Sequence, residues 1–220
     1  MTSADHSDAA WADARIRTFH GRHGRVTPRI QGILADLGPR HGLDTRQDRS
    51  RPLVLEVGSG DGGAALAFCA AFPDVDLVAI DVHTPGVVRL LEACAAGEAP
   101  NLFVERGDGL DLLDHRIESD ALAGIHLFFP DPWPKARHHK RRFVRPDVLD
   151  LVADRLEPGA PFLLATDVAD YVEWTIEHLD AHPSFAGGVA DRPTWRPVTR
   201  YERAGLDAGR HSVDLHYRAL

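Results

Sequence analysis

Glycines and carboxylates lie together directly after the first strand-like run of the sequence. Leu53–Val57 (LVLEV) is a short apolar run, and Gly58–Gly63 (GSGDGG) follows it. Glycines at such a position allow a tight turn, in which backbone N–H groups approach a ligand at the start of a helix. Gly58, Gly60 and Gly63 match G-x-G-x-x-G, which by itself is only weak support for a nucleotide site.

Three further carboxylates narrow the choice of ligand. Glu56 lies beside the glycine turn, Asp81 ends the second strand-like run, and Asp108 follows the third. Each alone could be a helix N-cap or a turn residue. Glu56 and Asp61 flank the turn and would repel a pyrophosphate, whereas S-adenosylmethionine lacks phosphate and carries cationic sulfonium and ammonium groups. We therefore expect an S-adenosylmethionine site of the class I methyltransferase type, with Asp81 on the ribose hydroxyls and Asp108 on the adenine amino group.

The segment after the fourth strand-like run combines a rigid backbone with polar and aromatic side chains. Phe129–Lys135 reads FPDPWPK, and its three prolines restrict the backbone just past a buried strand. They hold Asp131 beside the expected cofactor, and Trp133 offers a flat surface for a base or a plug for the core. A carboxylate and an aromatic ring beside a methyl donor suit the recognition of a nucleobase.

Two basic segments stand out in an acidic chain. The 220 residues include 25 Lys and Arg against 33 Asp and Glu, a net charge of -8, which taken alone argues against a nucleic-acid partner. Yet Arg15–Arg29 has five arginines and Lys135–Arg145 has six basic residues, and neither has an acid. Such segments can neutralise backbone phosphates. The neighbouring His138 and His139 are poorly spaced to share one ion, so no metal is expected.

The elements that must position these residues alternate short apolar runs with amphipathic ones. This pattern implies βαβ units and a sheet covered on both faces. Strands are expected at Leu53–Val57, Asp76–Ile80, Asn101–Glu105, Gly124–Phe129, Pro161–Thr166, Phe185–Val189 and His211–Arg218. Helices are expected at Pro28–Leu37, Gly63–Ala71, Pro85–Ala96, Pro146–Leu156 and Val168–His182.

The same pattern predicts the fold class and the domains. The fold is an α/β, Rossmann-like class I methyltransferase fold, with a mostly parallel seven-stranded sheet and an antiparallel C-terminal edge pair. Residues 1–50 would form a basic arm and helix, and residues 51–220 the methyltransferase domain.

Several features bear on the compartment. Cys69 and Cys94 have no metal or redox spacing, which favours buried reduced thiols. No apolar run approaches the roughly 18–20 residues that span a bilayer, and the first twenty residues lack the apolar core of a signal peptide. We therefore expect a cytoplasmic protein without a membrane partner, whose oligomeric state is open.

The chain resembles the bacterial tRNA (guanine-N7-)-methyltransferases. The signature is Phe129–Lys135, which continues into Arg137–Arg142 (RHHKRR), and the resemblance covers roughly Arg15 to Arg218. The further matching segments are Gly24–Thr27, Leu55–Gly58, Asp81–Gly86, Gly107–Asp108, Ala165–Asp167 and Arg196–Glu202. The departures are mild: Asp81 stands where a Glu is common, and Pro134 where a His is common.

The resemblance implies methyl transfer from S-adenosylmethionine to N7 of guanosine 46 in the variable loop of tRNA. It implies that Asp131 is the catalytic residue and that cofactor is bound by Glu56, Gly58, Gly60, Asp81, Asp108 and Asp131. Substrate-binding positions would be Lys135, Asp167, Thr199, Arg200, Tyr201 and Glu202. RNA contacts would come from Arg25, Arg137, His138, His139, Lys140, Arg141 and Arg142.

Local and functional alternatives remain beside the resemblance. Thr199 and Glu202 have the spacing of a helix capping box, and Asp167 could be an N-cap. An exocyclic amino-group methyltransferase would carry Asp/Asn-Pro-Pro-aromatic, whose second proline Asp131-Pro132-Trp133 lacks. A non-catalytic RNA-binding module would bind tRNA without transferring a methyl group to it. A nicotinamide-dependent oxidoreductase is the alternative that these residues support least.

Overall fold

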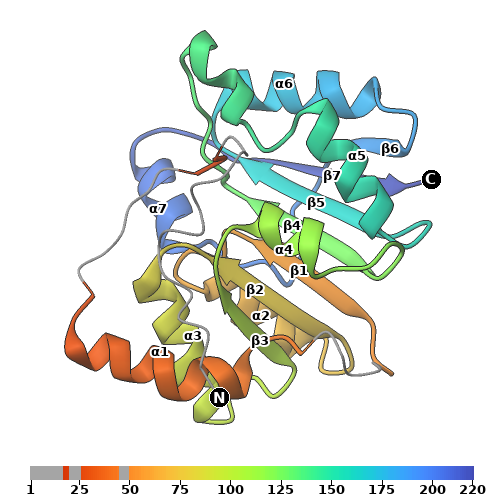
Figure 1. The fold of residues 1–220 in the computed structure, drawn as a ribbon. Coiled ribbons are helices and arrows are strands. Elements are labelled where there is room, and N and C mark those ends of the chain that lie inside the picture. Colours follow the sequence, from red (N-terminus) through yellow and green to blue (C-terminus); the bar gives the residue numbers. More distant parts are fainter. Residues whose placement is uncertain (1–16, 20–25, 45–49) are drawn as a thin grey trace.

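The computed structural model describes residues 17–19, 26–44 and 50–220, in which a seven-stranded sheet lies between two layers of helices (Figure 1). The strands are β1 (Leu53–Val57), β2 (Asp76–Asp81), β3 (Leu102–Arg106), β4 (Gly124–Phe128), β5 (Pro161–Thr166), β6 (Phe185–Ala190) and β7 (Val213–Ala219). The helices are α1 (Pro28–His41), α2 (Gly63–Ala71), α3 (Thr84–Ala95), α4 (Gly109–His115), α5 (Pro146–Arg155), α6 (Ala169–Asp180) and α7 (Arg200–Asp207), with a 3₁₀ helix, η2 (Ala136–Arg141).

The strand order is β3-β2-β1-β4-β5-β7-β6. The first five of these strands are parallel, and β7 runs antiparallel to both β5 and β6. The predicted Rossmann-like α/β sheet with an antiparallel C-terminal pair is thereby confirmed. Because β7 is inserted between β5 and β6, only β6 lies at that edge.

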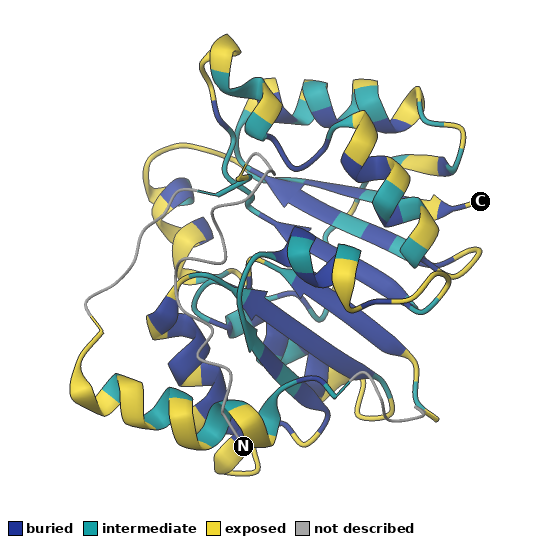
Figure 2. Cartoon of the chain, viewed as in Figure 1, coloured by how far each residue is buried: buried dark blue, intermediate teal, exposed yellow. Residues whose placement is uncertain are grey.

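Both faces of the sheet are covered, and its central strands β2, β1, β4 and β5 are largely buried (Figure 2). On one face α4, α5 and α6 pack residues such as Leu110 and Leu149 against Ile125 of β4. On the other face α2 and α3 pack residues such as Leu90 against Leu77 of β2. Helix α1 lies outside α3 and also contacts β3.

Three helices differ from the sequence-based expectation. Helix α1 continues past Leu37 to His41 although Pro39 lies in its last turn, and the N–H of Gly42 donates to the carbonyl of Gly38 to close that turn. Helix α4 has only seven residues, too few to show a clear helical period. Helix α7 reads RYERAGLD and has too few apolar residues to mark a buried face.

Both cysteines are free and buried, as expected. Burial raises the pKa of Cys69 to about 12 and that of Cys94 to about 11, so both thiols are protonated at neutral pH and unsuited to nucleophilic chemistry. None of the described helices is long and apolar enough to cross a membrane. Within the described ranges, no three His, Cys, Asp or Glu side chains form a metal-ligand group.

Candidate functional site

The glycine loop leads from β1 into α2 at the carboxyl edge of the parallel strands (Figure 1). Gly58 and Gly60 have φ angles of 76° and 59°, which favour glycine. The two carboxylate oxygens of Asp81 accept from the N–H of Gly60 at 2.6 Å and of His83 at 2.7 Å. A Cβ on Gly86 would lie 1.7 Å from the carbonyl oxygen of Gly60, so α3 begins directly against this loop. Asp81 therefore fixes the loops after β1 and β2 to each other.

Glu56 and Asp108 occupy different environments at the same edge. Glu56 is 2% exposed, and its Oε2 has no hydrogen-bond partner among the described residues. Asp108 caps α4 by accepting from the N–H of Leu110 at 3.0 Å, so the N-cap role that the sequence left open is present. A buried carboxylate oxygen without a donor suits a cationic ligand, because burying an unpaired charge is costly. This atom, with the glycine turn, fits S-adenosylmethionine.

The loop after β4 has two residues in the left-handed backbone region. Phe129 and Trp133 have φ angles of 54° and 45°, which are unfavourable for aromatic residues. The N–H of Phe129 donates to the carbonyl of Ala165 on β5 at 2.7 Å. The two residues flank the Pro130–Pro132 segment that carries Asp131. Strain of this kind persists only where the surrounding structure enforces it, and it concentrates at functional sites.

The two aromatic candidates of the site, Trp133 and Tyr201, differ in accessibility. Trp133 is 4% exposed, its Nε1 donates to the carbonyl of Thr18 at 2.8 Å, and Arg141 lies 4.8 Å from its ring centre. The structure therefore places Trp133 in the interior. Tyr201 is 54% exposed, with its ring 5.4 Å from that of Phe129. Tyr201 is the residue of the two that presents an aromatic surface.

The basic segment divides into outward and inward residues. Lys135, Arg137 and Lys140 are exposed, while His138, His139 and Arg141 are half-buried. Arg142 is fully buried: its Nε donates to the carbonyl of Pro132 at 2.9 Å, and a second nitrogen bonds Asp170. Its guanidinium also lies 4.7 Å from the ring centre of Trp174. The structure therefore assigns Arg142 to support of the Asp131 loop rather than to an RNA-facing surface, in contrast to the sequence-based expectation. Arg25 lies outside the described residues.

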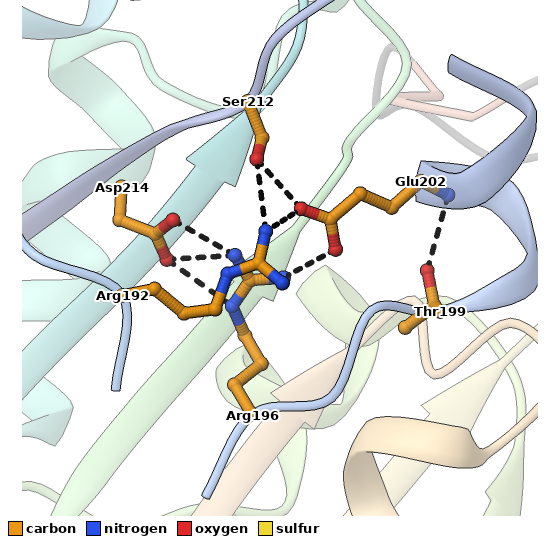
Figure 3. Close-up of polar contacts among 6 residues, drawn as sticks. All are labelled: Arg192, Arg196, Thr199, Glu202, Ser212 and Asp214. Atoms are coloured by element: carbon orange, nitrogen blue, oxygen red, sulfur yellow. Dashed lines mark hydrogen bonds and ion pairs between the residues drawn. The ribbon is translucent and has the colours of Figure 1, made fainter. Parts of the chain in front are cut away.

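A buried ion-pair network joins α7 to β7 and to the segment before α7 (Figure 3). Arg196 is fully buried; it donates to both oxygens of Asp214, at 2.8 and 2.9 Å, and to Glu202 at 3.1 Å. Glu202 also bonds Arg192, and it accepts from the hydroxyl of Ser212 at 2.6 Å. Sequence reasoning assigned no role to Arg192, Ser212 or Asp214 and gave Arg196 only as part of a matching segment, because spacing gives no signal that these distant residues meet.

The sequence left open two helix-capping roles, a capping box at Thr199 and Glu202 and an N-cap at Asp167. The structure shows only part of the first and not the second. Thr199 caps α7, since its hydroxyl accepts from the N–H of Glu202 at 3.3 Å. The return bond of a full capping box is absent among the described contacts, because the Glu202 carboxylate is turned toward the arginines. The N-cap of α6 is Val168 rather than Asp167, and Asp167 instead accepts from Arg210 at 2.8 Å. That ion pair raises the pKa of the Arg210 guanidinium.

Comparison with known proteins agrees with this architecture. Residues 50–215 match a family model described as "Putative methyltransferase". The tRNA (guanine-N(7)-)-methyltransferase of Nocardioides sp. is 48% identical over 215 residues, covering 92% of this chain and 87% of that protein. The Streptomyces coelicolor protein of the same name is 43% identical over 223 residues, covering 94% and 82%. The crystal structure of the 16S rRNA methyltransferase KamB shares the fold, with a TM-score of 0.54 at 18% identity over 93% of this chain and 99% of that one. The chain therefore belongs to the tRNA (guanine-N7-)-methyltransferase family.

Proposed function

We propose that this chain methylates N7 of guanosine 46 in the variable loop of tRNA, with Asp131 as the catalytic residue. Family membership supports the reaction and the tRNA substrate, and the resemblance of the Phe129–Arg142 signature supports position 46. The observation that carries the assignment of the site is the strained turn that holds Asp131 after β4, the parallel neighbour of β1 and its glycine loop. We further propose that residues 1–50 form a basic arm and helix that aid RNA binding, and that the protein acts in the cytoplasm.

Glu56, Asp81 and Asp108 would hold the cofactor together with the turn at Gly58 and Gly60. S-adenosylmethionine, the methyl donor of this family, supplies an electrophilic methyl group on a sulfonium. The three acids end successive strands, so they create a negative potential where a cation would bind. Asp81 also keeps the glycine turn closed through its bond to Gly60, which leaves the turn preorganised.

Asp131 would stabilise charge rather than remove a proton. N7 of guanine has an in-plane lone pair and no proton, so its methylation needs no general base. Positive charge develops on the purine ring, and a fixed carboxylate stabilises that charge and can accept from N1–H and the amino group. The prolines on either side of Asp131 keep the carboxylate in place, so little reorganisation is needed.

Exposed residues around this loop would receive the RNA. N7 faces the deep and narrow major groove of A-form RNA, so the target base must leave the stack or lie in a loop. Lys135, Arg137 and Lys140 are exposed beside the Asp131 loop and suit backbone phosphates. Arg200 and Tyr201 are exposed at the start of α7 and suit the base and its neighbours. Asp167, Thr199 and Glu202, whose side chains already have protein partners, would shape this surface.

Labelled S-adenosylmethionine and unmodified tRNA test the proposal. We expect alkali-labile N7-methylguanosine at position 46, and no label in tRNA whose position 46 is adenosine. Asp131→Asn removes one charge from a similar shape, and it should lower kcat by about a hundredfold or more while cofactor binding persists. Asp74→Asn, at an exposed aspartate in the turn before β2, is the matched control and should retain activity.

Three results would contradict parts of the proposal. Label on an exocyclic amino group would favour the rival methyltransferase class. Tight tRNA binding with no label would favour a non-catalytic module. A near-normal kcat in Asp131→Asn would contradict the proposal that the Asp131 carboxylate stabilises charge on the purine ring.

A further inference from the structure

A histidine lies against the buried cofactor-site carboxylate, on the neighbouring strand. Strands β1 and β4 are parallel, and their register pairs Glu56 with His126, so both side chains lie on the same face of the sheet. Each residue is 2% exposed. The Nδ1 atom of His126 lies 3.7 Å from Oε2 of Glu56, and neither atom has a hydrogen-bond partner among the described residues. At this separation the two groups can form an ion pair when the imidazole carries a proton.

The imidazole ring of His126 is held in place by aromatic side chains. The ring stacks on Phe128, with centroids 5.2 Å apart, and on Trp195, with centroids 5.1 Å apart. Phe68 approaches edge-on, with centroids 4.9 Å apart. This packing resists rotation of the ring, so Nδ1 stays close to Glu56.

The other groups around His126 do not replace Glu56 as its charge partner. Helix α2 contributes the Cys69 thiol, which burial and the nearby Glu56 charge keep protonated by raising its pKa to about 12. Strand β5 contributes Leu163, which is in register with His126. Arg196 lies over the far ring, Phe128, where Asp214 and Glu202 already neutralise it.

We propose that His126 is a proton-binding partner of Glu56 that couples cofactor affinity to pH. In acid, the imidazole of the cofactor-free enzyme takes up a proton and forms an ion pair with the Glu56 carboxylate. When the cationic cofactor binds at Glu56, the imidazole loses that proton to solvent, because the carboxylate can no longer compensate both positive charges in a buried site. The inference rests on the proposed role of Glu56 in cofactor binding.

The expected consequence is weaker cofactor binding in acid. If proton and cofactor exclude each other, cofactor affinity falls by up to about tenfold per pH unit where the pair is protonated, and each binding event releases up to about one proton there. This effect does not need the tRNA or the methyl transfer step.

Isothermal titration calorimetry can measure both quantities. S-adenosylmethionine and S-adenosylhomocysteine are titrated into the wild-type protein between about pH 5.5 and 8.5. Using two buffers of different ionisation enthalpy gives the number of protons released. We expect release to increase toward acid and affinity to fall with it. The amino group of the ligand itself titrates near pH 8, and the variant His126→Gln gives that contribution alone because it cannot bind the proton.

Variants separate the linkage from a loss of structure. His126→Gln, which retains an amide donor for Glu56, should bind with nearly flat pH dependence below pH 7. Glu56→Gln should bind weakly at every pH and also lose the linkage, which keeps the test decisive if His126→Gln does not fold. The control His115→Gln, at the exposed end of α4, should behave like wild type.

Different outcomes overturn different statements. The inference is wrong if wild type releases no proton on binding, or if His126→Gln keeps the wild-type pH dependence. Proton-linked cofactor binding without methyl transfer to tRNA would instead contradict the proposed function alone. Methyl transfer with pH-independent cofactor binding would leave that function intact and remove the inference.

Discussion

Arg196 places a positive charge in the interior, beside two carboxylates that are nearly as buried. Its side chain is fully enclosed, and those of Glu202 and Asp214 are 1% and 6% exposed. Figure 3 shows these ion pairs. The guanidinium also lies 5.2 and 5.6 Å from the ring centres of Phe128 and Phe129, at the end of β4. A single residue thus connects α7 and β7 to the strained turn that carries Asp131.

Removing the Arg196 guanidinium should be strongly destabilising, since it leaves two buried carboxylates without their partner. We expect Arg196→Met to lower the free energy of unfolding by about 3–5 kcal/mol. Arg196→Lys keeps the charge but cannot bond Asp214 through two nitrogens, so it should fall between this variant and wild type. Arg203→Met, at an exposed arginine of α7, is the matched control. Urea denaturation followed by circular dichroism measures the differences, and equal midpoints for Arg196→Met and Arg203→Met would contradict the network.

At the scale of elements, the Asp131 loop and η2 form one supported unit. Arg142 follows η2 directly, and its bond to the carbonyl of Pro132 holds the loop from inside. Its ring contact with Trp174 and its bond to Asp170 anchor the same guanidinium on α6. The basic segment therefore has two roles, with inward residues that shape the loop and outward residues that remain available to phosphates.

These two roles predict different responses to substitution. Lys140→Ala removes an exposed charge, and it should reduce the salt dependence of tRNA binding by about one contact, with little change in protein stability. Arg142→Met should lower stability and kcat, and should leave the salt dependence unchanged. Fluorescence anisotropy with labelled tRNA, measured over a range of salt concentrations, gives the slopes. A weaker salt dependence of tRNA binding in Arg142→Met would instead show that Arg142 contacts the RNA.

At the scale of the whole molecule, charge is unevenly distributed. The net charge is -8, yet Lys135–Arg145 contains six basic residues and no acid. This segment adjoins the carboxyl edge of the sheet, where the candidate cofactor site lies (Figure 1). Acidic surface elsewhere repels RNA, so productive approach is favoured at that edge.

The binding of tRNA should weaken steeply with salt in spite of the acidic composition. With about four phosphate contacts, affinity should fall on the order of a hundredfold between about 50 and 200 mM salt. Binding of S-adenosylhomocysteine releases few counterions and should change much less, which makes it the internal control. Filter binding measures the affinity for tRNA over this range of salt concentrations, and calorimetry measures the affinity for S-adenosylhomocysteine. A tRNA affinity that is insensitive to salt would contradict phosphate contacts as the main source of binding.

The sequence by itself determined the strands and the mostly parallel character of the sheet, but not helices α4 and α7 or the place of β7 between β5 and β6. Short apolar runs marked the parallel strands, because burial on both faces requires them. The acids at strand ends followed from the same pattern, since parallel strands bring their carboxyl ends to one edge. The three prolines, which restrict φ, likewise marked the Asp131 loop in the sequence.

Only the tertiary structure decided which polar residues meet and which way they face. Arg142 and Lys140 are both cations in one short segment, yet packing against Trp174 and the carbonyl of Pro132 encloses only Arg142. The contact between Glu56 and His126 depends on strand register, and that between Arg196 and Asp214 on the antiparallel return of β7. Burial and pairing are properties of distant segments brought together, so local composition and spacing do not encode them.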